Sequence, residues 1–279
     1  MRIYESIEAF QKPSKVVVSM GIFDGVHLGH QQLLQQLLKN SREVDSGAVV
    51  VTFWPHPRLV LAHTHPIPTR LLTTFDEKAA SLAQLGIDHL LKLQFTKTFS
   101  QLSAQTFVQQ VLVAQVGMTH LVVGHDHRFG KDRVGTIALL QEAGRHYNFT
   151  VEEVSPILID GVTISSTKIR QLLLEGNVEK AQAYLGRPYE IHCAPLQQDP
   201  GSDQHTPNTL IAATNPHKLI PLDGDYIVQA VCQDTTTEGC LRIARKNNVP
   251  NMTLSVPHDS KAILHAPSLC IRFKKNLCC

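Results

Sequence analysis

Short β-branched runs alternate with segments of helical period along the first two-thirds of the chain, and this alternation limits the fold more than any other feature. Residues 15–20 (KVVVSM) have the composition of a buried strand, and leucines at positions 33, 34, 37 and 38 then recur at the spacing of one helix face. Further strands are predicted at 48–53, 87–93, 119–124 and 149–154, with helices near 76–85, 103–115 and 136–147. The chain up to about residue 189 is therefore expected to form an α/β domain whose parallel sheet is covered by helices on both faces.

Two helices close this region, and single residues mark their ends. Gly176 can end the first in a left-handed conformation, Asn177 can cap the start of the second, and Gly186 can end it. Residues 196–208 (LQQDPGSDQHTPN) are typical of a linker or long loop, and short strand-like runs follow at 225–232, 241–244, 252–256 and 269–273. These patterns predict two domains, residues 1–187 and residues 188–279, the second small and β-rich.

Composition excludes several classes of protein. Lys and Arg together number 26 against 24 Asp and Glu, so the charge of +2 provides no broad field that would attract nucleic acid or an anionic membrane. No segment has the roughly 18 apolar residues of a membrane helix, and the first 15 residues lack an apolar stretch of signal-peptide length. The six cysteines form no C-x-x-C pair of a zinc or redox site. A cytoplasmic protein with reduced thiols is expected.

The sharpest functional motif, residues 21–30 (GIFDGVHLGH), lies directly between the first strand and the first helix. Its glycines allow a tight turn and the close approach of a polyphosphate, and the start of the helix favours anions. His27 and His30 can donate hydrogen bonds to phosphate oxygens whose charge grows during phosphoryl or nucleotidyl transfer. Two surface histidines at a helix start would leave the glycines unexplained, and a metal pair has no third ligand at a telling spacing.

The sequence does not match two other common nucleotide-binding motifs. Residues 124–131 only resemble a P-loop, because five residues separate Gly124 from Gly130 and Asp132 stands where Ser or Thr should bind magnesium. The chain also has no G-x-G-x-x-G motif. These absences disfavour a P-loop kinase and a dinucleotide-dependent dehydrogenase.

A second segment, residues 164–170 (ISSTKIR), opens a helix with hydroxyl groups at its cap and two cations in its first turns. Hydroxyls and helix N–H groups together form an anion cradle, and Arg170 could hold a phosphate in a bidentate grip. The alternative is plain capping by Ser165 or Ser166, with Arg170 in solvent.

Four blocks together resemble the bacterial riboflavin kinase/FMN adenylyltransferase family, the prokaryotic FAD synthetases. The blocks are residues 21–31, 52–57 (TFWPHP), 124–130 (GHDHRFG), and 164–170 followed by 185–189 (LGRPY). The pattern His-x-Gly-His alone is shared by many nucleotidyltransferases and class I tRNA synthetases, so the other blocks narrow the family. The resemblance implies a Rossmann-like nucleotidyltransferase domain followed by a diverged, barrel-like riboflavin kinase domain.

By position, the resemblance implies an enzyme that transfers AMP from ATP to FMN and releases pyrophosphate, with Mg²⁺ as cofactor and no nucleic-acid or membrane partner. His27 and His30 would steady the ATP phosphates, and Ser166, Thr167 and Arg170 would complete the triphosphate site. The FMN phosphate would attack in line, without a covalent enzyme intermediate. The further residues expected to bind the substrates are Gly21, Phe23, Asp24, Gly29, Phe53, Pro55, His56, Pro57, Asp126, Arg128 and Phe129, with those at 53–57 and 126–129 on the flavin side.

The sequence departs from the family pattern in two places. His127 stands where the family usually has Phe, which would alter the flavin contact unless His127 is only a partly exposed loop residue. The last third lacks the family's Gly-x-Pro-Thr-Ala-Asn motif and its later catalytic Glu. The segment most similar to that motif is Thr214-Asn215. Loss of riboflavin kinase activity is therefore expected.

Three other functions stay open at this point. The first is a complete bifunctional enzyme in which Thr214 and Asn215 replace the missing motif. The second is a regulatory protein that binds flavin or nucleotide without turnover. The third is a related nucleotidyltransferase that acts on another phosphate-bearing substrate.

Overall fold

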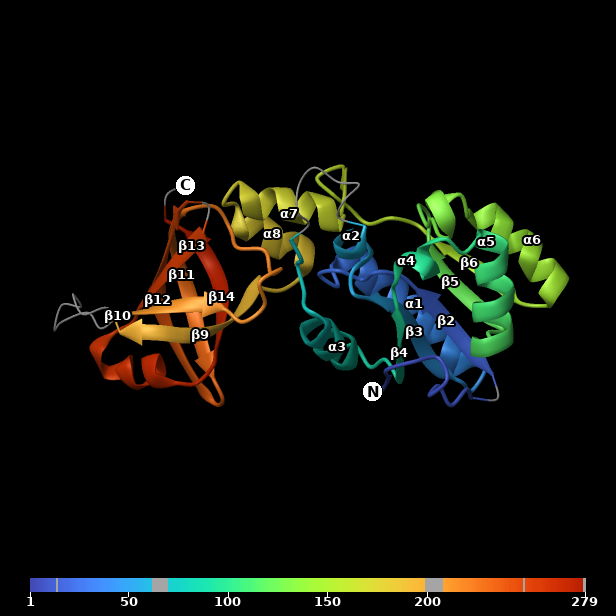
Figure 1. Ribbon diagram of the computed structural model, residues 1–279, viewed down its shortest axis with the longest axis horizontal. Coiled ribbons are helices and arrows are strands. Elements are labelled where there is room, and N and C mark those ends of the chain that lie inside the picture. The colour runs from blue at the N-terminus through green and yellow to red at the C-terminus, as the bar shows by residue number, and fades with distance from the viewer. Residues whose placement is uncertain (14, 62–69, 199–207, 248, 278–279) are drawn as a thin grey trace. The chain divides into compact units, whose positions relative to one another are not determined.

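The computed structural model describes residues 1–13, 15–61, 70–198, 208–247 and 249–277, and these fall into two compact units (Figure 1). The first unit comprises residues 1–69 and 75–164, and the second comprises residues 70–74 and 165–279. The domain boundary predicted at 187/188 marks a different feature, the change from helices to strands. Helices α7 (Ser166–Leu174) and α8 (Val178–Leu185) precede that change and group with the strands of the second unit.

The first unit is built on a parallel sheet with strand order β1-β4-β3-β2-β5-β6, counted over the described residues. The strands are β1 (Arg2–Tyr4), β2 (Val16–Met20), β3 (Gly47–Trp54), β4 (His89–Gln94), β5 (His120–Gly124) and β6 (Thr150–Val154). Five of them lie within two residues of the predicted bounds. The short β1 was not predicted, since three residues give little period to detect.

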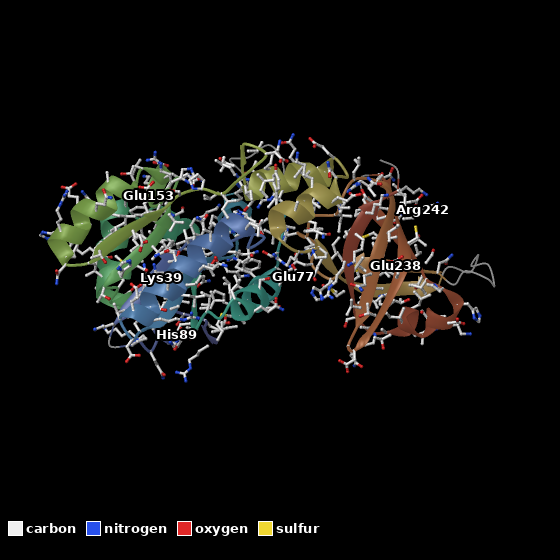
Figure 2. All side chains as sticks on the ribbon, turned by 180° about the vertical axis from the view of Figure 1, so that it is seen from behind. Lys39, Glu77, His89, Glu153, Glu238 and Arg242 are labelled. Carbon is white, nitrogen blue, oxygen red and sulfur yellow. The ribbon has the colours of Figure 1, made fainter. Side chains whose placement is uncertain are left out.

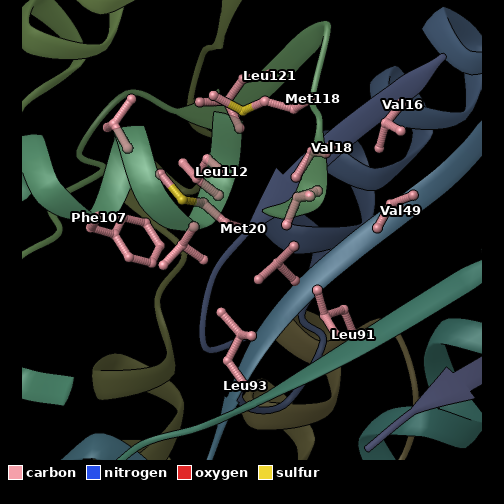
Figure 3. Packing of buried hydrophobic residues seen from close by; sticks show 14 of the residues in the cluster. Val16, Val18, Met20, Val49, Leu91, Leu93, Phe107, Leu112, Met118 and Leu121 are labelled. Atoms are coloured by element: carbon pink, nitrogen blue, oxygen red, sulfur yellow. The ribbon is translucent and has the colours of Figure 1, made fainter. Parts of the chain in front are cut away.

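Helices cover both faces of this sheet, which confirms the predicted α/β class. On one face, α1 (Leu28–Glu43) and α3 (Phe75–Gln84) pack their apolar residues against alternate positions of β2 and β3. On the other, η2 (Phe107–Val116) and α6 (Ile137–Tyr147) pack against the intervening positions, and Figure 3 shows Phe107 and Leu112 of η2 beside Met20. The remaining short elements are α2 (Pro57–Val60), α4 (Lys97–Ser100), α5 (Ala104–Thr106), η3 (Lys131–Arg133), β7 (Leu158–Ile159) and β8 (Val162–Thr163).

Capping residues mark the ends of α7 and α8 and the start of α8, as predicted. Gly176 and Gly186 have φ of 79° and 76°, in the left-handed region that favours glycine. The Asn177 Oδ1 atom accepts a hydrogen bond from the Lys180 N–H at 3.0 Å, which caps α8.

A closed antiparallel barrel with strand order β10-β13-β12-β11-β14-β9 forms most of the second unit in the part of the chain that the structure describes. The strands are β9 (Glu190–Gln198), β10 (Asn208–Ala213), β11 (Gly224–Cys232), β12 (Thr235–Lys246), β13 (Val249–Ser255) and β14 (Leu269–Asn276), and the helical segment η4 (His258–His265) precedes the last. Leu241 and Ile243 are buried, whereas Glu238 and Arg242 of the same strand point outward (Figure 2). The predicted β-rich, barrel-like domain is confirmed.

The linker predicted at 196–208 is partly wrong. Residues 196–198 continue β9 and Asn208 begins β10, while residues 199–207 lie outside the described residues. The polar composition of this segment is typical of a loop, but a barrel strand needs apolar residues only at every second position.

Within the described ranges, no helix combines the length and the hydropathy that a membrane span requires. The four described cysteines, Cys193, Cys232, Cys240 and Cys270, are thiols and not disulfides.

Gly144 of α6 provides a test of the packing. A Cβ at this position would lie 2.5 Å from the carbonyl oxygen of Phe149. Helix propensity alone favours Ala over Gly by about 1 kcal/mol, but we expect Gly144→Ala to lower the free energy of unfolding by about 1–3 kcal/mol, because the contacted atom is backbone and must shift. Urea unfolding followed by circular dichroism measures the change.

The matched control is Glu142→Ala, at an exposed position of the same helix, which should change the free energy of unfolding by less than about 0.5 kcal/mol. A Gly144→Ala protein more stable than the wild type would contradict the packing described here.

Candidate functional site

The strand order places a topological switch at β2. From β2 the chain moves outward through β3 and β4, and it later returns to β5 and β6 on the other side of β2. Ligands of open parallel sheets bind beyond the carboxyl ends of the strands at such a point. The segment that follows β2 there is residues 21–27, which lead into α1 and are called the phosphate loop below.

The phosphate loop has a strained backbone. Phe23, Gly25 and Val26 have φ of 50°, 86° and 41°, and Val26 is a β-branched residue for which positive φ is rare. Such strain is concentrated at functional sites. A Cβ on Gly21 would lie 3.1 Å from the Phe23 ring, and one on Gly29 would lie 3.3 Å from the His27 ring, so a larger residue at either position would require the neighbouring ring to shift by a few tenths of an ångström.

His27 and His30 lie together at the N-terminus of α1. Their rings stack with centroids 3.6 Å apart, and the edge of Phe23 packs against His30. The Nδ1 atom of His27 caps the helix by accepting a hydrogen bond from the His30 N–H at 3.3 Å. Because Nδ1 accepts, the ring proton of neutral His27 is on Nε2, which can donate to a ligand.

His30 is held neutral and has an unsatisfied atom. Burial lowers the pKa of His30 well below its usual value, and a positive charge on His27, when that ring is protonated, or on Lys78 lowers it further. The Nδ1 atom of His30 is buried and has no hydrogen-bond partner within the protein. A buried polar atom of this kind is costly unless a ligand or water satisfies it, so it points to a binding site.

Lys78 is a site residue that sequence reasoning missed. It lies on α3, is 1% exposed, and donates from Nζ to the Thr52 Oγ1 atom at 3.2 Å. Burial lowers the pKa of Lys78 to about 8, and the buried carboxylate of Asp24 in the phosphate loop opposes that shift. Thr52 in turn donates to the carbonyl oxygen of Ile22 at 3.3 Å, which ties the end of β3 to the loop. The sequence contained one signal for this residue, because Lys78 falls on the apolar face of the helix predicted near 76–85.

Aromatic side chains gather beyond the ends of β3 and β4. Phe53 packs against Phe95, Phe99 and Phe107 with centroids about 6 Å apart (5.9–6.2 Å), and Phe107 also contacts Phe129. We call these five residues the aromatic cluster. Phe53, Phe95 and Phe99 keep part of their surface exposed, whereas Phe107 and Phe129 are buried. Of these five residues, Phe53 and Phe129 were predicted from the sequence to bind substrate, and the other three were not.

The segment after β3 turns sharply at the same edge of the sheet. The Trp54–Pro55 peptide is cis, Pro55 is exposed, and Pro57 opens α2 at a position that suits proline. His56 is buried, and its Nδ1 atom accepts a hydrogen bond from the Arg58 N–H at 3.1 Å. His56 therefore holds the turn in place.

The loop after β5 carries the residues predicted on the flavin side. Asp126 and Arg128 are exposed, and His127 stacks on Phe129 with centroids 5.8 Å apart. The Nε2 atom of His127 is buried without a partner within the protein. Burial lowers the pKa of His127 to about 4, Arg133 adds to the shift, and Asp126 opposes it. His127 is thus a neutral side chain with a buried polar atom.

Ser166, Thr167 and Arg170 lie on α7, in the second unit. Ser165 is the N-cap and accepts from the Lys168 N–H at 3.3 Å, so Ser166 and Thr167 are the first helical residues. The Arg170 Nε atom donates to the carbonyl oxygen of Arg70 at 2.8 Å. Their joining with His27 and His30 in one site stays a prediction.

A sequence profile of the FAD synthetase family matches residues 9–168, more than half of the chain. The matched range includes the phosphate loop, the loops after β3 and β5, and the start of α7. The chain belongs to the FAD synthetase family. This finding confirms the family predicted from the four sequence blocks.

Two relatives are described as bifunctional riboflavin kinase/FMN adenylyltransferases. The protein of Buchnera aphidicola subsp. Schizaphis graminum (strain Sg) is 40% identical over 193 residues, which are 68% of this chain and 61% of that protein. The protein of Pseudomonas fluorescens is 35% identical over 234 residues, which are 84% of this chain and 74% of that protein. This chain therefore spans less than two-thirds of the length of the Buchnera protein.

A solved structure of a macrolide-efflux protein from Streptococcus pneumoniae has a TM-score of 0.85 with this chain at 24% identity, and covers 99% of this chain and 90% of its own. At that identity the likeness supports the fold.

The neutrality of His127 predicts a pH dependence of stability. Its pKa is about 4 when folded and near 6.5 when unfolded, so between these values the unfolded chain binds one more proton. The free energy of unfolding should therefore fall as the pH drops from about 6.5 to about 4, by up to about 1.4 kcal/mol per pH unit from this residue. His127→Phe removes that dependence and keeps a ring against Phe129.

Urea unfolding at pH 7.5, 6 and 5 measures the effect in wild-type protein, in His127→Phe, and in His146→Ala as an exposed-histidine control. The wild type should lose more stability on acidification than His127→Phe, and His146→Ala should follow the wild type. Equal slopes for all three proteins would show that His127 takes up a proton as readily in the folded chain.

Proposed function

We propose that this protein is an FMN adenylyltransferase, which transfers the AMP portion of ATP to FMN. In this reaction an oxygen of the FMN phosphate attacks the α-phosphorus of ATP, the bond from that phosphorus to the β-phosphate oxygen breaks, and FAD and pyrophosphate form. The observation that carries the proposal is the buried, unpartnered Nδ1 atom of His30 at the helix start that follows β2. Membership of the FAD synthetase family supports the choice of substrates.

The two histidines would bind the phosphates of ATP as hydrogen-bond donors. His27 donates from Nε2, because its Nδ1 atom is occupied by the His30 N–H. The rings are stacked 3.6 Å apart and would repel one another if both were charged, which disfavours protonation of both at once. Charge that develops on the phosphate oxygens is then stabilised by donors already in position, together with the N–H groups at the start of α1.

Lys78 would supply the fixed positive charge of the site. At a pKa of about 8 it is mostly protonated at neutral pH, and its contact with Thr52 holds it beside the phosphate loop. Ser166, Thr167 and Arg170 would complete the triphosphate site from α7, with helix N–H groups and the guanidinium as donors.

Mg²⁺ takes oxygen ligands and is commonly held by one or two carboxylates plus substrate phosphates. Asp24 is the carboxylate of the phosphate loop, and the Lys78 ammonium that it acts on is a cation and cannot serve as a ligand of this ion. The residues therefore fit a Mg²⁺ that arrives with ATP and takes Asp24 from the chain. When bound, the ion would neutralise charge on the phosphate oxygens.

The aromatic cluster would form the apolar wall for the flavin ring. Phe53, Phe95 and Phe99 offer partly exposed ring surface, and planar ring systems pack well against such surfaces. The buried Nε2 atom of His127 could form a hydrogen bond with a polar atom of the flavin, which the Phe usual in the family could not form.

Riboflavin kinase activity is proposed to be lost. The Oγ1 atom of Thr214 donates to the carbonyl oxygen of His192 at 3.2 Å, and the Oδ1 atom of Asn215 accepts from the His217 N–H at 2.9 Å. Both side chains thus stabilise the turn after β10, and the rest of the motif that binds ATP in related kinases is missing from the sequence.

The deciding experiment measures pyrophosphate release by purified protein with ATP, Mg²⁺ and either FMN or riboflavin, with the flavins resolved by chromatography. We expect FAD from FMN and no product from riboflavin. His30→Ala should lower kcat by about 10²–10³-fold, the usual effect of removing one transition-state donor. His146→Ala, an exposed histidine of the same unit, should retain wild-type kcat.

Each rival function has its own outcome in this assay. FMN formed from riboflavin would identify a complete bifunctional enzyme. Tight flavin binding without pyrophosphate release would indicate the regulatory protein. Equal turnover of other phosphomonoesters would indicate a nucleotidyltransferase of different specificity.

Arg170→Lys tests the contribution of α7. We expect the KM for ATP to rise about 10-fold or more, because lysine cannot form a bidentate contact with phosphate, while the KM for FMN changes little. Gln171→Ala, an exposed position on the same helix, should leave both constants unchanged. Steady-state kinetics with each substrate varied in turn measures the effect, and an unchanged KM for ATP in Arg170→Lys would remove this residue from the ATP site.

A further inference from the structure

Three potential metal ligands meet on the outer wall of the barrel. They are Glu190 and His192 of β9 and Cys270 of β14, and their ligand atoms all lie within 4.8 Å of one another. In the described residues they form the one such group of histidine, cysteine or acidic side chains.

Strand register explains the grouping. Cys270 pairs with His192 across the two strands, and Arg272 pairs with Glu190. Ile191 and Ile271, which lie between these positions, are fully buried, so the three ligands occupy the opposite, outward face. Directly opposed residues of neighbouring strands hold their Cβ atoms about 5 Å apart, close enough for one ion to join them.

We propose that Glu190, His192 and Cys270 bind one zinc ion. A thiolate, an imidazole and a carboxylate are all zinc ligands, whereas Mg²⁺ and Ca²⁺ require oxygen ligands. Three protein ligands leave the fourth position of a tetrahedral site for water or a small anion.

Neighbouring side chains hold the ligands in place. Arg272 donates from Nε to the Oε1 atom of Glu190 at 2.8 Å, which leaves Oε2 available to the ion. The main-chain N–H and the hydroxyl of Thr214 both donate to the carbonyl oxygen of His192, at 2.9 and 3.2 Å, and fix β9 at that residue. Outer partners that orient metal ligands in this way commonly raise metal affinity 10–100-fold.

The ion would join the first and last strands of the barrel. The pairing of β9 with β14 is one of the contacts that close it, and the ligands of the two strands are far apart in the sequence. A ligand set that exists only in the folded chain makes metal binding stabilise the fold. Bound zinc would thus stabilise the pairing of β9 with β14 that closes the barrel.

The test is zinc binding to the full chain, freed of metal, measured by competition with a chromophoric chelator. We expect one tight site in the wild type. His192→Ala and Cys270→Ser should each weaken zinc binding by about 100-fold or more, beyond the usual effect of losing an outer partner. Cys232→Ser, which removes a partly buried cysteine of β11, should bind zinc as the wild type does.

Cobalt(II) and alkylation provide readouts that do not depend on the variants' stability. Cobalt bound to the wild type should show thiolate-to-metal charge-transfer absorption, and zinc should slow iodoacetamide modification of Cys270, but not of Cys232, in wild-type protein mapped by mass spectrometry. Equal zinc affinity in the wild type, His192→Ala and Cys270→Ser would overturn the proposal, as would alkylation of Cys270 that zinc does not change.

Discussion

A parallel strand buried on both faces and paired on both edges is the constraint from which the first unit follows. All five residues of β2 are buried, and β3 and β5 pair with its two sides. Apolar side chains on both faces need helices above and below the sheet, and parallel connections supply them. The same connections bring the carboxyl ends of neighbouring strands to one edge. The phosphate loop, the turn after β3 and the loop after β5 are neighbours for that reason.

Burial shifts the pKa values of three side chains at that edge of the sheet. Dehydration makes charge costly for His30 and His127, and it lowers the pKa of Lys78 toward neutrality. Only Asp24 opposes the shift of Lys78 by its charge. Under the proposed function, a phosphate that enters the site would meet donors that are already desolvated, so its charge would be stabilised with little reorganisation. The strained backbone at Val26 is consistent with a loop shaped for a ligand.

In the barrel of the second unit, the fold constrains mainly the residues that face inward. Its inward positions are apolar, and its outer face is free to vary in polarity without loss of the fold. A barrel can therefore keep its architecture while the residues on its outer face differ. Thr214 and Asn215 stabilise a turn, and three potential metal ligands lie on the outer wall where β9 meets β14.

The residues alone predicted the α/β class, five of the six sheet strands, the helix caps at Asn177 and Gly186, and the motif that carries His27 and His30. These features depend on period and on residues adjacent in the chain, which a sequence displays directly. It did not disclose Lys78, Phe95 and Phe99, or the first two strands of the barrel. Three facts required the folded chain: Lys78 lies near Asp24, the Nδ1 atom of His30 has no partner among the described residues, and Cys270 lies beside His192. Burial and contact between distant residues arise when the chain packs, and no local pattern of residues records them.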